Sequence, residues 1–134
     1  MSASVELQTA IYNALLADAG VAALVGDRVY DGAPSNREYP CITFGPMDSV
    51  PDDMECITAS SETVQLDIWS REQGRLRPCK EICSAVKKAL HDADLGLTVN
   101  ALVQIRTEGM RVFLDADGRT AHGVVTVMAE LEEA

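Results

Sequence analysis

The side chains of this chain best suited to chemistry are its four cysteines and two histidines. Cys79 and Cys83 are four residues apart, a spacing that places both thiols on one face of a helix. Structural zinc sites usually present two close pairs of cysteines on turns, and this chain has only one close pair. Ile82 and Val86 flank these thiols, and a free cysteine packs as a small hydrophobic residue. We therefore predict that Cys79 and Cys83 face the core, without a metal or a disulfide.

The histidines and the one calcium-like motif do not form a recognisable site either. His91 is expected at a helix end, where it complements the helix dipole, and His122 on an exposed strand face. The motif Asp115-Ala116-Asp117-Gly118 resembles the start of a calcium loop, but residues 119–123 supply none of the further ligands that such a loop needs. It predicts a hairpin turn. We expect no catalytic, cofactor or metal site, and hence no enzyme.

Charge and hydropathy narrow the possible partners. The chain has 134 residues and a formal net charge of −10, from 21 acidic and 11 basic residues. Such a surface repels nucleic-acid phosphates at long range, so specific binding of DNA is not expected. No apolar run is long enough to span a bilayer, and the first residues lack the pattern of a signal peptide, so we expect no membrane partner and a cytoplasmic location.

The basic residues are concentrated in one part of the chain. Six of the eleven basic residues fall within residues 71–88, which leaves the remaining surface strongly acidic. This asymmetry favours self-association, or binding to a partner of complementary charge. We therefore take Arg71, Arg75, Arg77 and Lys80 as a candidate subunit interface.

Two amphipathic helices are predicted from apolar residues that recur at helical spacing. The first covers residues 4–17 and is broken by Gly20, after which residues 21–25 form a helical turn that ends at Gly26. The second starts between Gly74 and Pro78, because proline is tolerated only near a helix beginning. Its apolar stripe comprises Leu76, Cys79, Ile82, Cys83, Val86 and Leu90.

The remaining apolar runs predict strands. Residues 63–69 alternate most clearly, and shorter strands are expected at 28–30, 41–45, 102–105, 111–114 and 123–129. Glu108-Gly109 could be either a tight turn or a bulge within one long strand. The order predicts one domain over residues 1–134, an α+β fold of two layers. A mostly antiparallel five- or six-stranded sheet would carry the two amphipathic helices on one face.

Two features of this fold are candidates for contacts with other molecules. Residues 46–61 combine two prolines with few large apolar residues and are predicted to be a mobile, solvated docking loop. Its acidic residues are Asp48, Asp52, Asp53 and Glu55. Trp69 falls on the sheet face opposite Val64, Leu66 and Ile68. It belongs either to an exposed subunit contact or beneath another part of its own chain.

Several short motifs, in order over residues 7–131, resemble the tail completion (tail terminator) proteins of long, flexible-tailed phages and gene transfer agents. They are Leu24-Val25-Gly26-Asp27-Arg28-Val29-Tyr30, Tyr39-Pro40-Cys41-Ile42, Ile68-Trp69-Ser70-Arg71 with Gly74, the helix end Ala89-Leu90, and Asp115-Ala116-Asp117-Gly118 with His122-Gly123. The resemblance implies a structural virion protein, assembled in the cytoplasm and then part of the tail at the head–tail junction.

A protein of that family is expected to form a ring, usually of six copies, that caps the tail tube and ends its elongation. Its partners would be further copies of itself, the tail tube protein and the head–neck connector or stopper protein, with DNA passing through unbound. The family supplies no catalytic residue.

Two other interpretations are compatible with the residues. One is a small acidic interaction module without a virion role, which would stay monomeric at high concentration. The other is a small hydrolase or metal enzyme, which would need a bound metal or a pocket that joins His91 or His122 to a cysteine.

Overall fold

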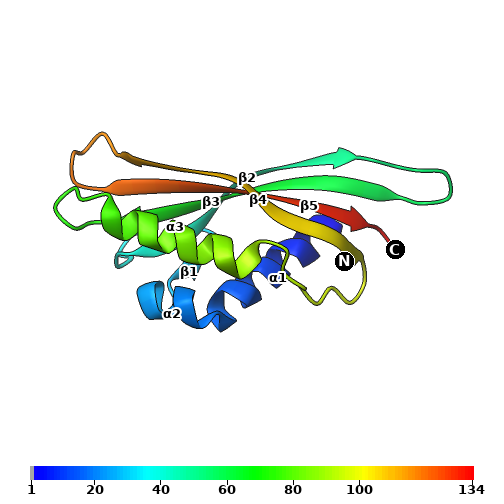
Figure 1. Ribbon diagram of the computed structural model, residues 1–134, viewed down its shortest axis with the longest axis horizontal. Helices are drawn as coiled ribbons and strands as arrows, with labels where there is room; N and C mark the ends of the chain where they lie inside the picture. The colour runs from blue at the N-terminus through cyan, green and yellow to red at the C-terminus, as the bar shows by residue number, and fades with distance from the viewer. Residues whose placement is uncertain (1) are drawn as a thin grey trace.

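Three helices pack on one face of a five-stranded sheet in the computed structural model, which describes residues 2–134 (Figure 1). The elements are α1 (Ala3–Ala17), α2 (Ala19–Val25), β1 (Val29–Tyr30), β2 (Cys41–Pro51), β3 (Ala59–Ser70), α3 (Arg77–Leu90), β4 (Ala101–Leu114) and β5 (Ala121–Glu132). The two-layer α+β architecture that the sequence predicted is confirmed, with α2 as a third helix on the covered face.

The strand order of the sheet is β1-β2-β3-β5-β4. Every neighbouring pair is antiparallel except β1 and β2, which run parallel over two residues. The sheet is therefore mixed, although the prediction of a mostly antiparallel sheet holds. In β3, Val64, Leu66 and Ile68 are buried beneath the helices, as their alternation predicts. Trp69 lies on the opposite face, which no helix of the described residues covers.

A single residue, Asp18, separates α1 from α2. Its backbone is extended, and its carboxylate accepts a hydrogen bond of 2.9 Å from the Val21 N–H, so it caps α2. The prediction that Gly20 breaks the helix was wrong, because the break is at Asp18 and Gly20 lies in the first turn of α2. In the described residues no single helix is long and apolar enough to cross a membrane; only α1 and α2 together, bent by 79°, have that length and composition.

Helix α3 lies close against the sheet at Gly123 of β5. A Cβ atom placed on Gly123 would be 2.5 Å from the Cys83 sulfur and 2.9 Å from the Cys79 sulfur, both closer than real Cβ contacts. Cys79 and Cys83 are buried free thiols of the core, and Cys79 donates a hydrogen bond to the Ile68 carbonyl. The predicted position of these cysteines is confirmed, and their small size lets the helix sit on the strand.

Residues 46–61 differ most from their prediction. They form not an irregular loop but a hairpin, because β2 runs on to Pro51 and β3 begins at Ala59. We call residues 46–61 the arm and residues 52–58 its tip. The register shifts between Phe44 and Met47, so Gly45-Pro46 is a bulge rather than a strand end. The arm extends past the helices, at the right of Figure 1, so its side chains need no buried apolar face.

At the other end of the sheet, β4 and β5 form a second hairpin. Its strand β4 is continuous with register shifts at Leu102/Gln104 and Thr107/Gly109, which makes Glu108-Gly109 part of a bulge. The predicted turn at residues 115–118 is confirmed. Its ends are joined by a hydrogen bond of 2.7 Å from the Asp115 N–H to the Thr120 carbonyl.

Glu6 of α1 anchors the segment that leads into β4. Its carboxylate accepts backbone hydrogen bonds of 2.8–2.9 Å from the N–H groups of Thr98, Val99 and Asn100. These hydrogen bonds lower the pKa of Glu6 to about 2. The first helix and the segment before β4 are thereby joined, although they lie far apart in the sequence.

Candidate functional site at the two ends of the sheet

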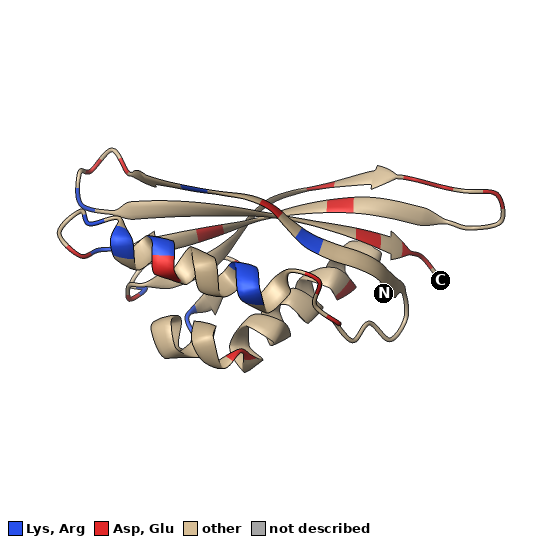
Figure 2. Cartoon of the chain, viewed as in Figure 1, with Lys and Arg blue, Asp and Glu red and all other residues tan. Residues whose placement is uncertain are grey.

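The basic residues of the candidate interface gather at one end of the sheet, in the loop before α3 and the first turn of that helix (Figure 2). Arg75 and Lys80 are exposed, and Arg77 forms an ion pair with Glu81 at 3.1 Å. We call residues 71–80 the basic end. Lys87 and Lys88 belong to the same basic stretch of sequence but lie in the last turn of α3, so the structure does not place them at this end.

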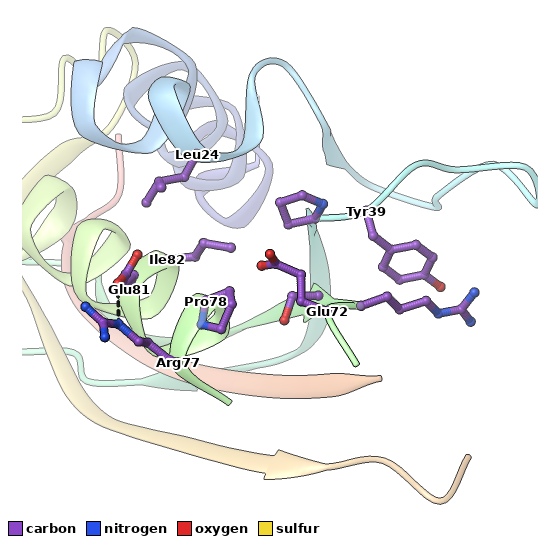
Figure 3. A pocket seen from close by; sticks show the side chains of 10 residues that line it. Leu24, Tyr39, Glu72, Arg77, Pro78, Glu81 and Ile82 are labelled. Carbon is purple, nitrogen blue, oxygen red and sulfur yellow. Dashed lines mark hydrogen bonds and ion pairs between the residues drawn. The ribbon is translucent and has the colours of Figure 1, made fainter. Parts of the chain in front are cut away.

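A cleft of about 500 Å³ opens at the basic end (Figure 3). Apolar groups of Leu24, Pro78 and Ile82 line it together with charged groups of the predicted interface, Arg71 and Arg77. Its other lining residues are Tyr39, Pro40, Ser70, Glu72 and Glu81. The cleft thus combines an apolar lining with two guanidinium groups and two carboxylates.

Arg71 is held in place by its own chain. Its guanidinium lies over the Tyr39 ring, 4.2 Å from the ring centre, and its Nε donates a 3.0 Å hydrogen bond to the Thr120 hydroxyl. Thr120 in turn donates a hydrogen bond to Asp117, whose carboxylate also accepts from the backbone N–H groups of Arg119 and Thr120. These hydrogen bonds lower the pKa of Asp117 to about 2. Arg71 therefore lines the cleft with a guanidinium group that already has partners in its own chain.

The acidic residues of the predicted docking loop lie at the opposite end of the molecule, on the arm (Figure 2). Asp48, Asp52, Asp53 and Glu55 are all exposed. Asp53 accepts one hydrogen bond of 3.0 Å from the Ala59 N–H, which closes the tip. Exposed apolar residues accompany these charges: Met47, Val50, Met54 and Ile57. An acidic segment with exposed apolar side chains is suited to binding a surface that is both basic and apolar.

Trp69, the fifth residue of the candidate interface, lies apart from the basic residues on the uncovered face of the sheet. Its ring stacks on His122, with ring centres 3.9 Å apart, and its Nε1 donates a hydrogen bond of 3.0 Å to the Thr43 hydroxyl. His122 also contacts Phe113 and is hydrogen-bonded at 2.7 Å to Asp67. The Trp69 side chain is half-buried by its sheet neighbours, and the structure does not bring it together with the basic end.

Within residues 2–134, no three side chains of the metal-binding types gather closely enough to hold an ion. Burial raises the pKa of the Cys41 thiol, and contact with Cys79 together with burial raises that of Cys83, whereas the same contact lowers the pKa of Cys79. His91 accepts a hydrogen bond from the Thr107 N–H at the end of α3, the position predicted for it.

Sequence reasoning missed two parts of this arrangement. It did not assign Tyr39 and Leu24 to a cleft, although both belong to the motifs that carried the family resemblance. Nor did it predict the contact between Asp67 and His122. Alternation along β3 places Asp67 on the same face as Trp69, whose ring stacks on His122. A cleft formed by segments far apart in the sequence has no local signal.

Comparison with known protein families identifies the family to which this chain belongs. The model of the family described as tail completion protein gp17 matches residues 9–132. The chain belongs to the tail completion protein gp17 family. Tail completion proteins are structural components of virion tails and not enzymes, so this tail completion protein acts by assembling with other virion proteins. No curated protein matches the chain.

Two solved structures are similar to this tail completion protein. A chain in the virion of a native gene transfer agent particle has a TM-score of 0.90 and 25% sequence identity, and the match covers 98% of both chains. The gp17 protein of bacteriophage SPP1 has a TM-score of 0.62 and 23% identity over 95% of this chain and 89% of that one. The second similarity shows the shared fold.

Proposed function

We propose that this tail completion protein forms a closed ring of six copies that caps the tail tube, ends its elongation and joins the tube to the head–neck connector. The family membership supports the role in the tail, and the separation of charge between the two ends of the molecule supports the ring. A surface that contacts a different surface of the next copy forms a heterologous interface, which closes into a ring when the rotation allows it.

The partners we propose are further copies of this chain, the tail tube protein and the connector or stopper protein of the neck. Assembly takes place in the cytoplasm, before the protein becomes part of the particle. DNA passes through the ring without being bound, because a chain with a net charge of −10 repels the phosphate backbone. The contact between copies uses Arg75, Arg77 and Lys80 against acidic groups of the neighbour.

The tail role is tested in particles assembled without a functional copy of this protein. We expect tubes that grow past their normal length and do not join heads, as seen by electron microscopy of particle preparations. Tails of normal length attached to heads would contradict the proposed function.

The contact between copies is tested by reversing charge at the basic end. Replacing Arg75, Arg77 and Lys80 by glutamate should preserve the fold, since these side chains are exposed, but abolish ring formation and tail capping. The control replaces Lys87 and Lys88 by glutamate at the other end of the same helix. We leave Arg71 unchanged, because its contacts with Tyr39 and Thr120 are internal. Equal capping by both variants would exclude the basic end as the interface.

A further inference from the structure

We propose that the arm tip of one copy inserts into the cleft at the basic end of the next copy. The inference rests on the proposed ring and specifies which atoms form its contacts. It assigns a binding role to the tip, residues 52–58, and to the cleft beside Arg77, and its ligand is a second copy of this chain.

The tip has the chemistry of a ligand. It carries Asp52, Asp53 and Glu55, and no basic residue occurs anywhere in residues 46–61. Met54 is 65% exposed and Ile57 41% exposed, so large apolar side chains face water beside the carboxylates. These apolar groups do not contribute to the core of their own chain, and a partner that covered them would gain the free energy of their burial.

The cleft has the complementary chemistry. Leu24 and Pro78 are partly exposed and provide apolar surface for the tip, and the buried Ile82 also lines the cleft. Arg77 stands at the edge of the cleft with its side chain 88% exposed (Figure 3). The Arg77–Glu81 ion pair is a solvent-exposed contact on one helix face, and such pairs contribute little to stability. A carboxylate from an incoming tip can therefore replace Glu81 as the partner of Arg77. Residues 71–81, around the cleft, carry four basic and two acidic residues, a net charge of +2 that attracts the tip.

The positions of the two surfaces fit a ring. The tip and the basic end lie at opposite ends of the sheet (Figures 1 and 2), and the cleft opens at the basic end, so one copy can bind a neighbour at each end at the same time. Because tip and cleft are different surfaces, each interface leaves one free tip and one free cleft until the ring closes. The tail tube protein and the connector are the alternative occupants of the cleft, and the experiments below distinguish them.

A disulfide cross-link tests the contact directly. Cys56 lies in the tip and is exposed, whereas Cys41, Cys79 and Cys83 are buried. In the Glu81→Cys variant, mild oxidation of the full-length protein should join Cys56 of one copy to the introduced thiol of the next. We expect covalent dimers and longer ladders on non-reducing gels, both for concentrated protein and for assembled particles.

Two controls accompany this cross-link. Glu81→Cys combined with Cys56→Ser must lose the ladder, which excludes pairing between two introduced thiols. Lys87→Cys places an exposed thiol on the same helix away from the cleft and should give no ladder. The proposal is wrong if Lys87→Cys and Glu81→Cys cross-link equally, if neither does so in assembled particles, or if Glu81→Cys joins only to another virion protein.

A charge exchange provides an independent test. Asp52→Lys with Glu55→Lys, or Arg75→Glu with Arg77→Glu, should each weaken self-association by at least about tenfold, because like charges then meet across the interface. A mixture of the two variants should associate through the mutant tip and the mutant cleft. Asp53 is kept, since it closes the tip. Circular dichroism and thermal melting verify that each variant is folded.

The results of these experiments distinguish a failure of the tip–cleft contact from a failure of the proposed tail function. If neither charge variant changes association and no cross-link forms, yet particles without the protein have overgrown tails, the tip–cleft contact is wrong and the tail role stands. If tails are normal without the protein, the proposed function fails whatever the cross-link shows.

Discussion

The two hairpins at opposite ends of the sheet use their carboxylates in different ways. In the β4–β5 turn, Asp117 accepts hydrogen bonds from Thr120 and from two backbone N–H groups, and Thr120 passes the connection on to Arg71. In the β2–β3 tip, Asp53 alone accepts a hydrogen bond, from Ala59, while Asp52 and Glu55 are exposed. The β4–β5 turn shapes the cleft, and the β2–β3 tip presents charge to solvent.

This difference separates carboxylates that are held by the fold from carboxylates that are exposed to solvent. Glu6 and Asp117 are surrounded by hydrogen-bond donors, which lower the pKa of both. The acidic residues of the arm lie past the helices, where solvent and salt screen their repulsion. We expect substitutions near the helices to change stability, and substitutions in the tip to change association. Three experiments test this contrast, from the largest expected effect on stability to the smallest.

The largest effect is expected at Gly123, the third residue of β5. Gly123→Ala places a methyl group against the sulfurs of Cys79 and Cys83, which should cost about 1–3 kcal/mol of unfolding free energy. Gly109→Ala is the control on the neighbouring strand, because a Cβ there meets no atom within 4 Å, and should stay within about 0.5 kcal/mol of the original chain. Urea unfolding measures both. Equal midpoints would contradict the close approach of α3.

Acid should affect the two hydrogen-bonded carboxylates next. Glu6 has a folded pKa of about 2 against an ordinary 4.5, and Asp117 about 2 against 3.8. Because both folded values are lowered, their stabilisation is present above pH 4.5 and is lost as the pH falls towards 2. When thermal melting is measured between pH 6 and pH 2, the melting temperature should therefore fall as the pH drops from the ordinary pKa values of these two groups towards their folded values. Glu6→Gln should flatten this fall and lower the melting temperature at neutral pH; an unchanged profile would contradict the anchor.

The smallest effect on stability is expected in the tip. Asp52→Asn with Glu55→Gln removes two exposed charges that make no contact needed by the fold, so the unfolding free energy should change by less than about 0.5 kcal/mol. The same double variant should weaken self-association, measured by analytical ultracentrifugation. A large loss of stability would show that the tip belongs to the folded body.

The sequence predicted those parts of the fold whose apolar residues recur at a fixed period. The alternation of Val64, Leu66 and Ile68 identified the central strand, and the stripe around Cys79 and Cys83 identified the face of α3. The arm was missed because its strands are paired but not covered, and backbone pairing leaves no apolar period. Gly45-Pro46 has the composition of a strand end, whereas the register shift there shows a bulge that lets β2 continue.

The candidate site was predictable in composition but not in geometry. Counting charges located the basic stretch at residues 71–88 and the acidic one at residues 46–61. Counting could not show that the two stretches lie at opposite ends of the sheet, since that follows from the length of β3, which runs from the tip at Ala59 to the basic end at Ser70. It also could not separate Arg71, which contacts Tyr39 and Thr120 far away in the sequence, from Arg75, which is exposed and hydrogen-bonds to nearby Gln73. The roles of these residues in a contact between copies stay predictions.

The anchor at Glu6 has a consequence for the order in which the protein matures during its synthesis. The ribosome makes Glu6 early, whereas its donors at residues 98–100 emerge after both strands of the arm have been made. Translation adds roughly 5–20 residues per second, so the arm spends several seconds outside the ribosome before this anchor can form. The residues that line the cleft, all between positions 24 and 82, are likewise made before the anchor can form. Closure of the anchor is therefore a late step, which joins the first helix to the segment before β4 after both binding surfaces have been synthesised.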